Sequence, residues 1–412
     1  MLQTDSMRHF RLATCMRRFA AAGPLLLAAV MAVAQDSTGS VEGTGDAARD
    51  VAAVQAAVDR GGTVVLKGTF DFGESGSVSI RTDVEILGDL SSSQPTTRIK
   101  GGRWSFHSPL PAHLPVPAPG PAITIRGIHF DGAAMGPVQL SYARSVVVSD
   151  NRITAVKPLP SPQPILGRDG LLLQHGIALG PFLSFPGAYP ANALTGEVKV
   201  ERNFIDLLGT QPDNTLGQGI LLAWGTGVRA SIVENTVLNA SRNGIEALDN
   251  HPDTQGEGFV LVRSNHVTTP VNGLAFPGPS FPNAIIAGWF LDPAGGADPA
   301  RRMKHVVTDN LIRARGQTSM GVAVLTDEAV VANNNITCQG KASRGIVLFG
   351  SGATVLGNRV QGSGAAAIAF SAGAPPLRGS RNVVSGNDLT AYRPASGAIQ
   401  ADEGAQGNLV LE

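Results

Sequence analysis

The chain has 412 residues with 32 basic and 32 acidic side chains, so its formal net charge at pH 7 is zero. A balanced charge without a basic tail or patch argues against a nucleic-acid partner. The two cysteines are Cys15 and Cys338. Because Cys15 lies in a segment that we expect to be removed, an intramolecular disulfide in the mature chain is excluded.

Residues 1–34 have the layout of a secretory signal. Several arginines precede an apolar run from Ala20 to Val33, and the small residues Ala32 and Ala34 flank the end of that run. The run is too short to span a membrane, and a buried N-terminal helix is the alternative interpretation. We therefore expect cleavage near Ala34, a secreted or periplasmic location, and no membrane span.

A helix is predicted after a linker that we assign to residues 35–45. Asp46 is a suitable N-cap, and the apolar residues of 47–59 fall near one helical face. Gly61 and Gly62 end the helix. We expect this helix to cover one end of a repeat domain that spans residues 46–412, because open ends of solenoids expose apolar side chains and strand edges. Short strands are predicted next, at Thr63–Leu66 and Val78–Leu87.

A short phrase recurs through the rest of the chain: an apolar residue, two free positions, Asn, one free position, and Val, Ile or Leu. The asparagines of successive copies are 24 to 52 residues apart. We expect the flanking apolar residues to face inward and Asn to occupy a bent or left-handed corner, where amides stacked about 4.8 Å apart bond one another. The eight copies carry Asn151, Asn203, Asn235, Asn265, Asn310, Asn334, Asn358 and Asn387, and a ninth, partial copy carries Asn408.

A second strand usually opens with Gly further along each repeat. Gly permits the turn that redirects the chain. The segments between the strands lack room and periodicity for crossover helices, and the repeats are too short for propeller blades of about 40–45 residues. The pattern therefore predicts an all-β fold, a parallel β-helix. The second strands are expected at Gly176-Ile177, Gly219-Ile220, Gly244-Ile245, Gly273-Leu274, Gly321-Val322 and Gly345-Ile346.

The predicted capping helix, the stretch Gly-Gly-Thr-Val-Val-Leu-Lys-Gly-Thr-Phe at 61–70 and the Asn-bearing coils together resemble the right-handed parallel β-helix family of pectate-lyase-like proteins. The resemblance covers residues 46–412. It implies the fold, and it leaves the activity open, because that family includes polysaccharide lyases, glycoside hydrolases, uronan epimerases, phage tailspikes and non-enzymatic periplasmic proteins. No catalytic signature of one subfamily is present, and the Asp-Pro-His-type motif of the alginate epimerases is absent.

Three long insertions interrupt the repeats: 155–174 lies between the two strands of one repeat, and 180–196 and 277–303 follow the second strand, as does the short segment 249–257. Because 180–196, 249–257 and 277–303 leave the same corner of their coils, we predict that they wall a groove along one side of the solenoid. Aromatic side chains suit the apolar faces of sugar rings, although packing of the insertions onto the coil is the alternative role. We predict that the substrate-binding residues include Trp224, Trp289, Tyr189 and His251.

Glu246 is the leading catalytic candidate. It points outward on a second strand, at a position that is apolar or small in the neighbouring repeats, and Asp249 and Asp253 follow it. Paired carboxylates can cleave a glycosidic bond, clustered carboxylates can instead bind Ca²⁺, and a solvated acidic turn is the alternative without function. Asp327 and Glu328 stand at a similar offset two repeats on, and a calcium-assisted lyase would also need a base such as Arg242 or Arg263. The sequence does not identify a metal.

Two functions of different class remain open at this stage. The first is a secreted polysaccharide lyase or glycoside hydrolase that acts in the groove, with a polysaccharide as partner. The second is a non-enzymatic periplasmic or surface β-helix with a binding or structural role. The low charged fraction of 16% and the missing catalytic signature favour the second function, whereas the outward Glu246 and the aromatic insertions favour the first.

Overall fold

The computed structural model describes residues 39–89, 94–112, 119–161, 169–181, 190–207, 215–248, 258–269, 282–288, 303–372, 378–394 and 397–411. The expected signal at 1–34 lies outside these ranges. Within them the chain forms one helix, α1 (Ala47–Arg60), and strands of three sheets. No helix of this described part is long and apolar enough to cross a membrane.

The strands fall into three sheets, named A, B and C. Sheet A contains β1 (Gly39–Glu42), β2 (Gly62–Lys67), β5 (Val84–Leu87), β8 (Ala122–Arg126), β11 (Ala143–Ser149), β15 (Leu194–Glu201), β18 (Thr226–Val233), β21 (Phe259–Arg263), β24 (Lys304–Thr308), β27 (Val330–Ala332), β30 (Thr354–Leu356), β33 (Val383–Ser385) and β36 (Leu409–Leu411). Sheet B contains β3 (Thr69–Asp71), β6 (Thr97–Lys100), β9 (Ile128–Asp131), β12 (Arg152–Thr154), β16 (Phe204–Asp206), β19 (Thr236–Leu238), β22 (His266–Thr268), β25 (Leu311–Ala314), β28 (Asn335–Gln339), β31 (Arg359–Gly364) and β34 (Tyr392–Pro394). Sheet C contains β4 (Val78–Ser79), β7 (Phe106–Ser108), β10 (Val138–Leu140), β14 (Leu172–Leu179), β17 (Thr215–Leu222), β20 (Asn243–Ala247), β23 (Asn283–Ala287), β26 (Met320–Val324), β29 (Arg344–Leu348), β32 (Ala366–Phe370) and β35 (Ile399–Ala401), with β13 (Leu159–Pro160) paired beside β14.

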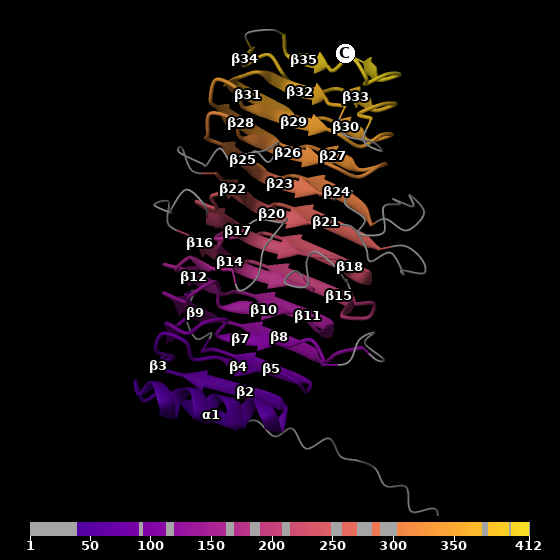
Figure 1. Cartoon of the computed structure of the whole chain (residues 1–412). Coiled ribbons are helices and arrows are strands. Elements are labelled where there is room, and N and C mark those ends of the chain that lie inside the picture. The colour runs from indigo at the N-terminus through magenta and orange to yellow at the C-terminus, as the bar shows by residue number, and fades with distance from the viewer. Residues whose placement is uncertain are drawn as a thin grey trace, which may run out of the picture. The chain divides into compact units, whose positions relative to one another are not determined.

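Each coil passes through sheets A, B and C in turn, and each strand pairs in parallel with the strand of the next coil. The described strands therefore wind into a stack of coils that runs from α1 to β36 (Figure 1). Among the described residues, the one antiparallel pairing is that of β13 with β14. The fold is the right-handed parallel β-helix that the sequence predicts.

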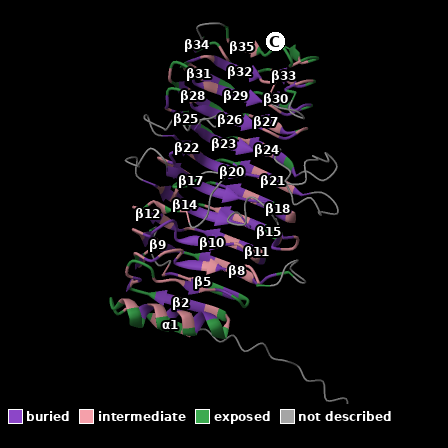
Figure 2. Cartoon of the chain, viewed as in Figure 1, coloured by how far each residue is buried: buried purple, intermediate pink, exposed green. Residues whose placement is uncertain are grey.

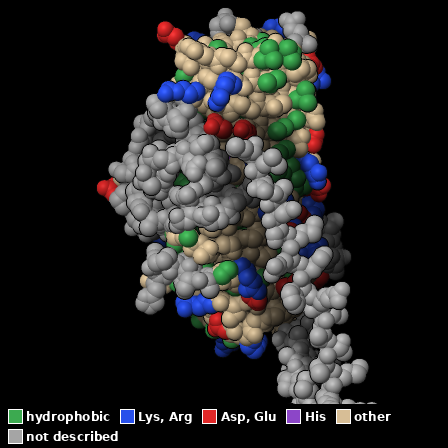
Figure 3. Space-filling view, turned by 90° about the vertical axis from the view of Figure 1, so that its right-hand side faces the viewer, with side chains coloured by type: hydrophobic (Ala, Val, Ile, Leu, Met, Phe, Trp, Pro, Cys, Tyr) green, Lys and Arg blue, Asp and Glu red, His purple; other side chains and the backbone are tan. Residues whose placement is uncertain are grey.

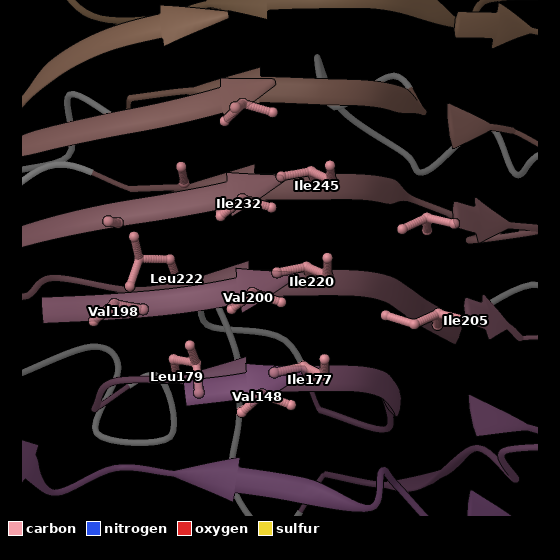
Figure 4. Packing of buried hydrophobic residues seen from close by; sticks show 14 of the residues in the cluster. Val148, Ile177, Leu179, Val198, Val200, Ile205, Ile220, Leu222, Ile232 and Ile245 are labelled. Atoms are coloured by element: carbon pink, nitrogen blue, oxygen red, sulfur yellow. The ribbon is translucent and has the colours of Figure 1, made fainter. Parts of the chain in front are cut away.

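A single apolar core fills the inside of the coils. The inward residues of successive coils lie one above another, as the stacked Val148, Val200 and Ile232 illustrate (Figure 4). All three side chains are 0% exposed. Because parallel strands lie about 4.8 Å apart, like side chains in register make continuous contacts along the stack. The central strands of sheet C are buried over most of their length, those of sheets A and B alternate between buried and more exposed positions, and α1 keeps an exposed face (Figure 2).

The recurring asparagines form the expected ladder at the corner between sheets A and B. Asn203 shows the pattern: its backbone N–H and its Nδ2 both donate to Oδ1 of Asn235, at 3.0 and 2.9 Å, and its Nδ2 also donates to the carbonyl of Val148, at 2.8 Å. The same amide-to-amide bond links all eight predicted asparagines from Asn151 to Asn387. The ladder therefore gives buried corner groups the partners that water cannot supply.

Two details of the predicted corner are wrong. The left-handed residue is the one before each Asn, as Arg202 at φ 54° and Glu234 at φ 59° show, and not the Asn itself. Asn is selected for its donor and acceptor pair, not for backbone freedom. The ninth copy is also not a ladder member: Asn408 precedes its sheet A strand and bonds Asn382, which belongs to a different corner.

Helix α1 covers the first coil, as expected. Asp46 caps its N-terminus by accepting from the backbone of Arg49. The side-chain amide of Gln55 pairs with both backbone groups of Ser79 on the edge strand β4. The buried carboxylate of Asp50 accepts from the backbone N–H of Asp71 on the edge strand β3. Burial opposes its charge, but these hydrogen bonds outweigh burial and lower the pKa of Asp50. The helix thus satisfies backbone hydrogen-bonding groups of edge strands that could otherwise pair with strands of other chains.

Two further predictions need correction. The expected linker 35–45 contains β1, because Gly39–Glu42 pairs in parallel with β2 and starts sheet A. The second strand expected at Gly273-Leu274 lies outside the described residues; the sheet C strand of that coil is β23, whose Ile285 is in register with Ile245 of β20. The predicted insertion 277–303 therefore contains a strand of the core, with Ala284 where other coils have Gly.

Charged side chains contribute little to the stacking of the coils. On the face that Figure 3 shows, hydrophobic side chains form a line over the upper part of the molecule, and charged side chains are scattered around it. Sheet A accordingly carries outward apolar residues in register, such as Leu261 beside Val306 and Val330. Surface ion pairs such as Arg126–Asp150 are partly exposed and stabilise a fold by only about 0–1 kcal/mol each. The core and the ladder therefore hold the coils together.

Replacing Asn334 with Asp should destabilise the fold strongly. The substitution removes the amide that donates to the carbonyl of Val307 and to Oδ1 of Asn358, and it places a buried carboxylate against those oxygens. We expect a loss of at least about 3 kcal/mol in the free energy of unfolding. The matched control is Asn335→Asp, at the next residue, which is exposed on sheet B and should change stability by less than about 0.5 kcal/mol. Equal midpoints in urea unfolding would contradict the ladder's role.

Acid should weaken the fold through two buried histidines. Burial lowers the pKa of His175 and of His305 to about 4. The unfolded chain takes up these protons below about pH 6.5, so stability is complete above that pH and falls as the pH decreases toward 4, by up to about 3 kcal/mol per histidine. The measurement is the unfolding free energy of the wild type and of His305→Leu across this range. The variant should show the smaller pH slope, and an unchanged slope would exclude His305 as a source.

Candidate functional site on the outer face of sheet C

The outward positions of sheet C form a column that is mostly apolar. Glu246 on β20 lies in register between Leu221 on β17 and Ile286 on β23. Ala178 and Ala323 extend the column on either side. The residues on either side of Glu246 along β20, Ile245 and Ala247, belong to the central core. Glu246 therefore points outward, as predicted. It is the one carboxylate among the described members of this column.

Two small apolar clusters lie outside the coil, on either side of Glu246. The first joins Leu221, Trp224 and Leu248 with residues of the preceding coils. The second joins Ile286, Met320 and Val347 of the following coils. An apolar outer surface of this kind is unusual for a face that simply contacts water, and it indicates a covered or ligand-binding face.

Amide side chains surround the Glu246 carboxylate. Gln218 of the preceding coil donates from Nε2 to Glu246 Oε2, and Asn243 donates from Nδ2 to the same oxygen at 2.6 Å. Asn283 of the following coil donates to Asn243 Oδ1 at 2.9 Å. Two amide donors on one oxygen suit an ionised carboxylate, which accepts only. Glu246 is 4% exposed, so its surroundings are polar but largely closed to solvent.

The amides belong to a second column beside that of Glu246. His175, Gln218, Asn243 and Asn283 follow one another in register on β14, β17, β20 and β23. Burial lowers the pKa of His175 to about 4, so its imidazole is neutral at physiological pH. Oε1 of Gln218 has no hydrogen-bond partner among the described groups, although the residue is 3% exposed. An unpaired buried acceptor costs about 1–3 kcal/mol, which a ligand hydroxyl would recover.

The other predicted site residues have different outcomes. Trp224 is 4% exposed and packs in the outer cluster with Leu221 and Leu248, so its indole contributes to packing in this structure. Trp289, Tyr189, His251, Asp249 and Asp253 lie outside the described residues.

Of the remaining charged candidates, Asp327, Glu328 and Arg263 lie apart from Glu246. Asp327 accepts from the backbone N–H of Ser351 at a corner two coils away, and Glu328 beside it is exposed. Arg263 lies on sheet A, whereas Arg242 is buried next to Asn243. In the part of the chain that the structure describes, no group of three or more His, Cys, Asp or Glu side chains lies close enough to hold a metal ion.

The sequence analysis missed the amides and His175. Their common signal is a polar residue directly before the Gly or Ala that precedes an inward Ile of the second strand, as in Gln218-Gly219 and Asn243-Gly244. In a single repeat, a polar residue followed by Gly or Ala cannot be distinguished from an ordinary strand end. Only the register of the coils brings residues 25 to 43 positions apart into one column.

No protein-family model and no curated protein matches the sequence. Among solved structures, the A-module of a mannuronan C-5 epimerase from Azotobacter vinelandii is 14% identical at a TM-score of 0.47, with 87% of this chain and 91% of that chain covered. The surface protein and adhesin PfbA of Streptococcus pneumoniae is 12% identical at 0.49, with 90% and 100% covered. DFA-IIIase from Arthrobacter chlorophenolicus A6 is 12% identical at 0.35, with 92% and 95% covered. Similarity at this level carries no information about activity.

Proposed function

We propose that this right-handed parallel β-helix is a carbohydrate-active protein that binds a polysaccharide along the outer face of sheet C. We propose that it acts as a polysaccharide lyase or a glycoside hydrolase and that Glu246 is a catalytic residue. The observation that supports this proposal most directly is the isolated Glu246 carboxylate, held by two amides between apolar clusters. Burial of a carboxylate costs desolvation free energy, and such residues are often found at functional sites.

The chemistry of the surroundings fits a sugar polymer. Amide and carboxylate oxygens are suitable partners for sugar hydroxyls, and the apolar side chains Leu221 and Ile286 flank them in register. Glu246, fixed by Gln218 and Asn243, would exchange a proton with the substrate. Successive coils repeat about every 4.8 Å, so a column along the stack suits an extended polymer better than a small molecule.

A second carboxylate is needed for hydrolysis of a glycosidic bond. The two carboxyl groups of glycosidases stand about 5–5.5 Å apart when configuration is retained and about 6.5–9.5 Å apart when it is inverted. We assign this role to Asp249 or Asp253, which follow Glu246 closely in sequence. Trp289, Tyr189 and His251 are the proposed contacts to further sugar units, and Trp224 packs in the outer apolar cluster with Leu221 and Leu248.

Calcium does not fit the described residues alone. Ca²⁺ takes about six to eight oxygen ligands, several of them usually carboxylates. Near Glu246 the described residues offer one carboxylate, and its Oε2 already accepts from Gln218 and Asn243. No step of the proposed reaction is therefore assigned to a metal.

A non-enzymatic binding protein is the second candidate function. The observation in its favour is that the described neighbours of Glu246 are amides and apolar groups, with no second acidic side chain among them. In that case the column of His175, Gln218, Asn243 and Asn283 would bind sugar hydroxyls without cleaving the chain. For either function we propose a secreted or periplasmic location, which rests on the signal-like residues 1–34.

Glu246→Gln should separate turnover from binding. Gln keeps the size of the side chain and an oxygen that can accept from Gln218, but it cannot take up or release a proton. The wild type is screened against uronic-acid and neutral polysaccharides, with and without Ca²⁺, by ultraviolet absorbance of unsaturated products and by new reducing ends. On a polymer that the wild type degrades, we expect kcat to fall by about 10²–10⁴-fold while KM stays similar.

The matched control is Glu197→Gln, an exposed glutamate on the outer face of sheet A. It should leave turnover unchanged. Full activity of Glu246→Gln would remove Glu246 from the reaction. Binding of a polymer without any cleavage by the wild type would favour the non-enzymatic function.

A further inference from the structure

The outer face of sheet B carries a row of basic and aromatic residues that the site on sheet C does not use. They occupy equivalent positions on consecutive coils, and each is at least partly exposed. We call this row the sheet B strip. Its members are Arg98 on β6, His129 on β9, Arg152 on β12 and Phe204 on β16.

Arg152 and Phe204 form the centre of the strip. The guanidinium carbon of Arg152 lies 4.3 Å from the centroid of the Phe204 ring. The negative face of the ring attracts the cation, which restrains Arg152 at this position on the strip. Within the described residues Arg152 has no ion pair. The fold thus presents a restrained cation that has no carboxylate partner among the described side chains.

The neighbouring groups do not neutralise this charge. Acidic residues lie on both neighbouring strands: Asp131 pairs with Arg98 and accepts from Thr154 at 3.2 Å, and Asp206 accepts from Asn239 Nδ2 at 2.9 Å. His129 contacts the same threonine, with Nε2 2.9 Å from Thr154 Oγ1. Asp131 is therefore used by Arg98 and the threonine, and the strip keeps one positive charge at Arg152.

We propose that the sheet B strip binds an acidic polysaccharide, with Arg152 pairing to a carboxylate of a uronic-acid unit. A guanidinium offers parallel N–H donors that match the two oxygens of a carboxylate. Positions that repeat about every 4.8 Å along the stack suit an extended polymer that runs parallel to the solenoid axis. A nucleic acid fits less well, because its affinity depends on several unpaired cations, whereas this chain has as many acidic as basic residues.

This surface is independent of the proposed reacting centre. Arg152 lies on sheet B and Glu246 on sheet C, so loss of either function leaves the residues of the other in place. The strip would hold a polymer on the solenoid whether or not the protein cleaves it.

The test compares binding to polygalacturonate with binding to its fully methyl-esterified form, which keeps the backbone and removes the charge. Arg152→Gln should weaken binding of polygalacturonate by at least about tenfold. Arg152→Lys should recover only part of the affinity, because an ammonium neither stacks flat nor binds with two parallel donors. The matched control is Arg229→Gln, an exposed arginine on the outer face of sheet A, which should bind like the wild type. Thermal melting checks that each variant is folded.

Three results would overturn the proposal. One is equal affinity of Arg152→Gln and Arg229→Gln for polygalacturonate. The second is equal binding of the charged and the esterified polymer by the wild type. The third is tighter binding of single-stranded DNA than of polygalacturonate with the same dependence on Arg152. Retained binding by Glu246→Gln together with lost binding by Arg152→Gln would support the strip separately from the reacting centre.

Discussion

Hydrogen bonding of the buried corner between sheets A and B is the constraint on which the rest of the structure depends. Eight coils, from Asp150-Asn151 to Gly386-Asn387, turn there through a left-handed residue followed by Asn, and each turn leaves backbone groups without water. The asparagine amide supplies a donor and an acceptor at once, so each coil satisfies the next, as Asn203 and Asn235 do. A shift by one residue would break these bonds and move core residues such as Val200 outside.

Strict register has a consequence for the outer faces. Residues far apart in sequence become neighbours at fixed positions, and the outer surface can be used without disturbing the core. Gln218 and Glu246 meet on sheet C across 28 residues, and Arg152 and Phe204 meet on sheet B. The outer faces of sheets B and C can differ in chemistry because outward side chains do not pack in the apolar core. One scaffold can therefore carry a buried acidic centre and a separate basic strip.

Particular residues show where sequence reasoning succeeded and where it did not. The ladder, the capping helix and the outward direction of Glu246 were predictable, because each follows from a local pattern. The strand β23 was not, since Ala284 replaces the expected Gly and an earlier Gly273 offered a better local match. Asn408 was misassigned because its flanking residues resemble the ladder phrase, although it precedes its strand instead of following it.

The sequence by itself determined the fold of the coils. A recurring pattern of apolar residues and Asn predicts parallel strands that stack around an apolar core. It also identified Glu246 as the exceptional outward residue. Only the tertiary structure decided that this carboxylate is buried and bonded by amides, that Trp224 packs instead of facing a groove, and that Arg152 lies on Phe204. The physical reason is that contacts between side chains of neighbouring coils depend on how many residues each coil contains. The insertions make that number irregular along the chain, so the pairs in contact do not follow from the sequence alone.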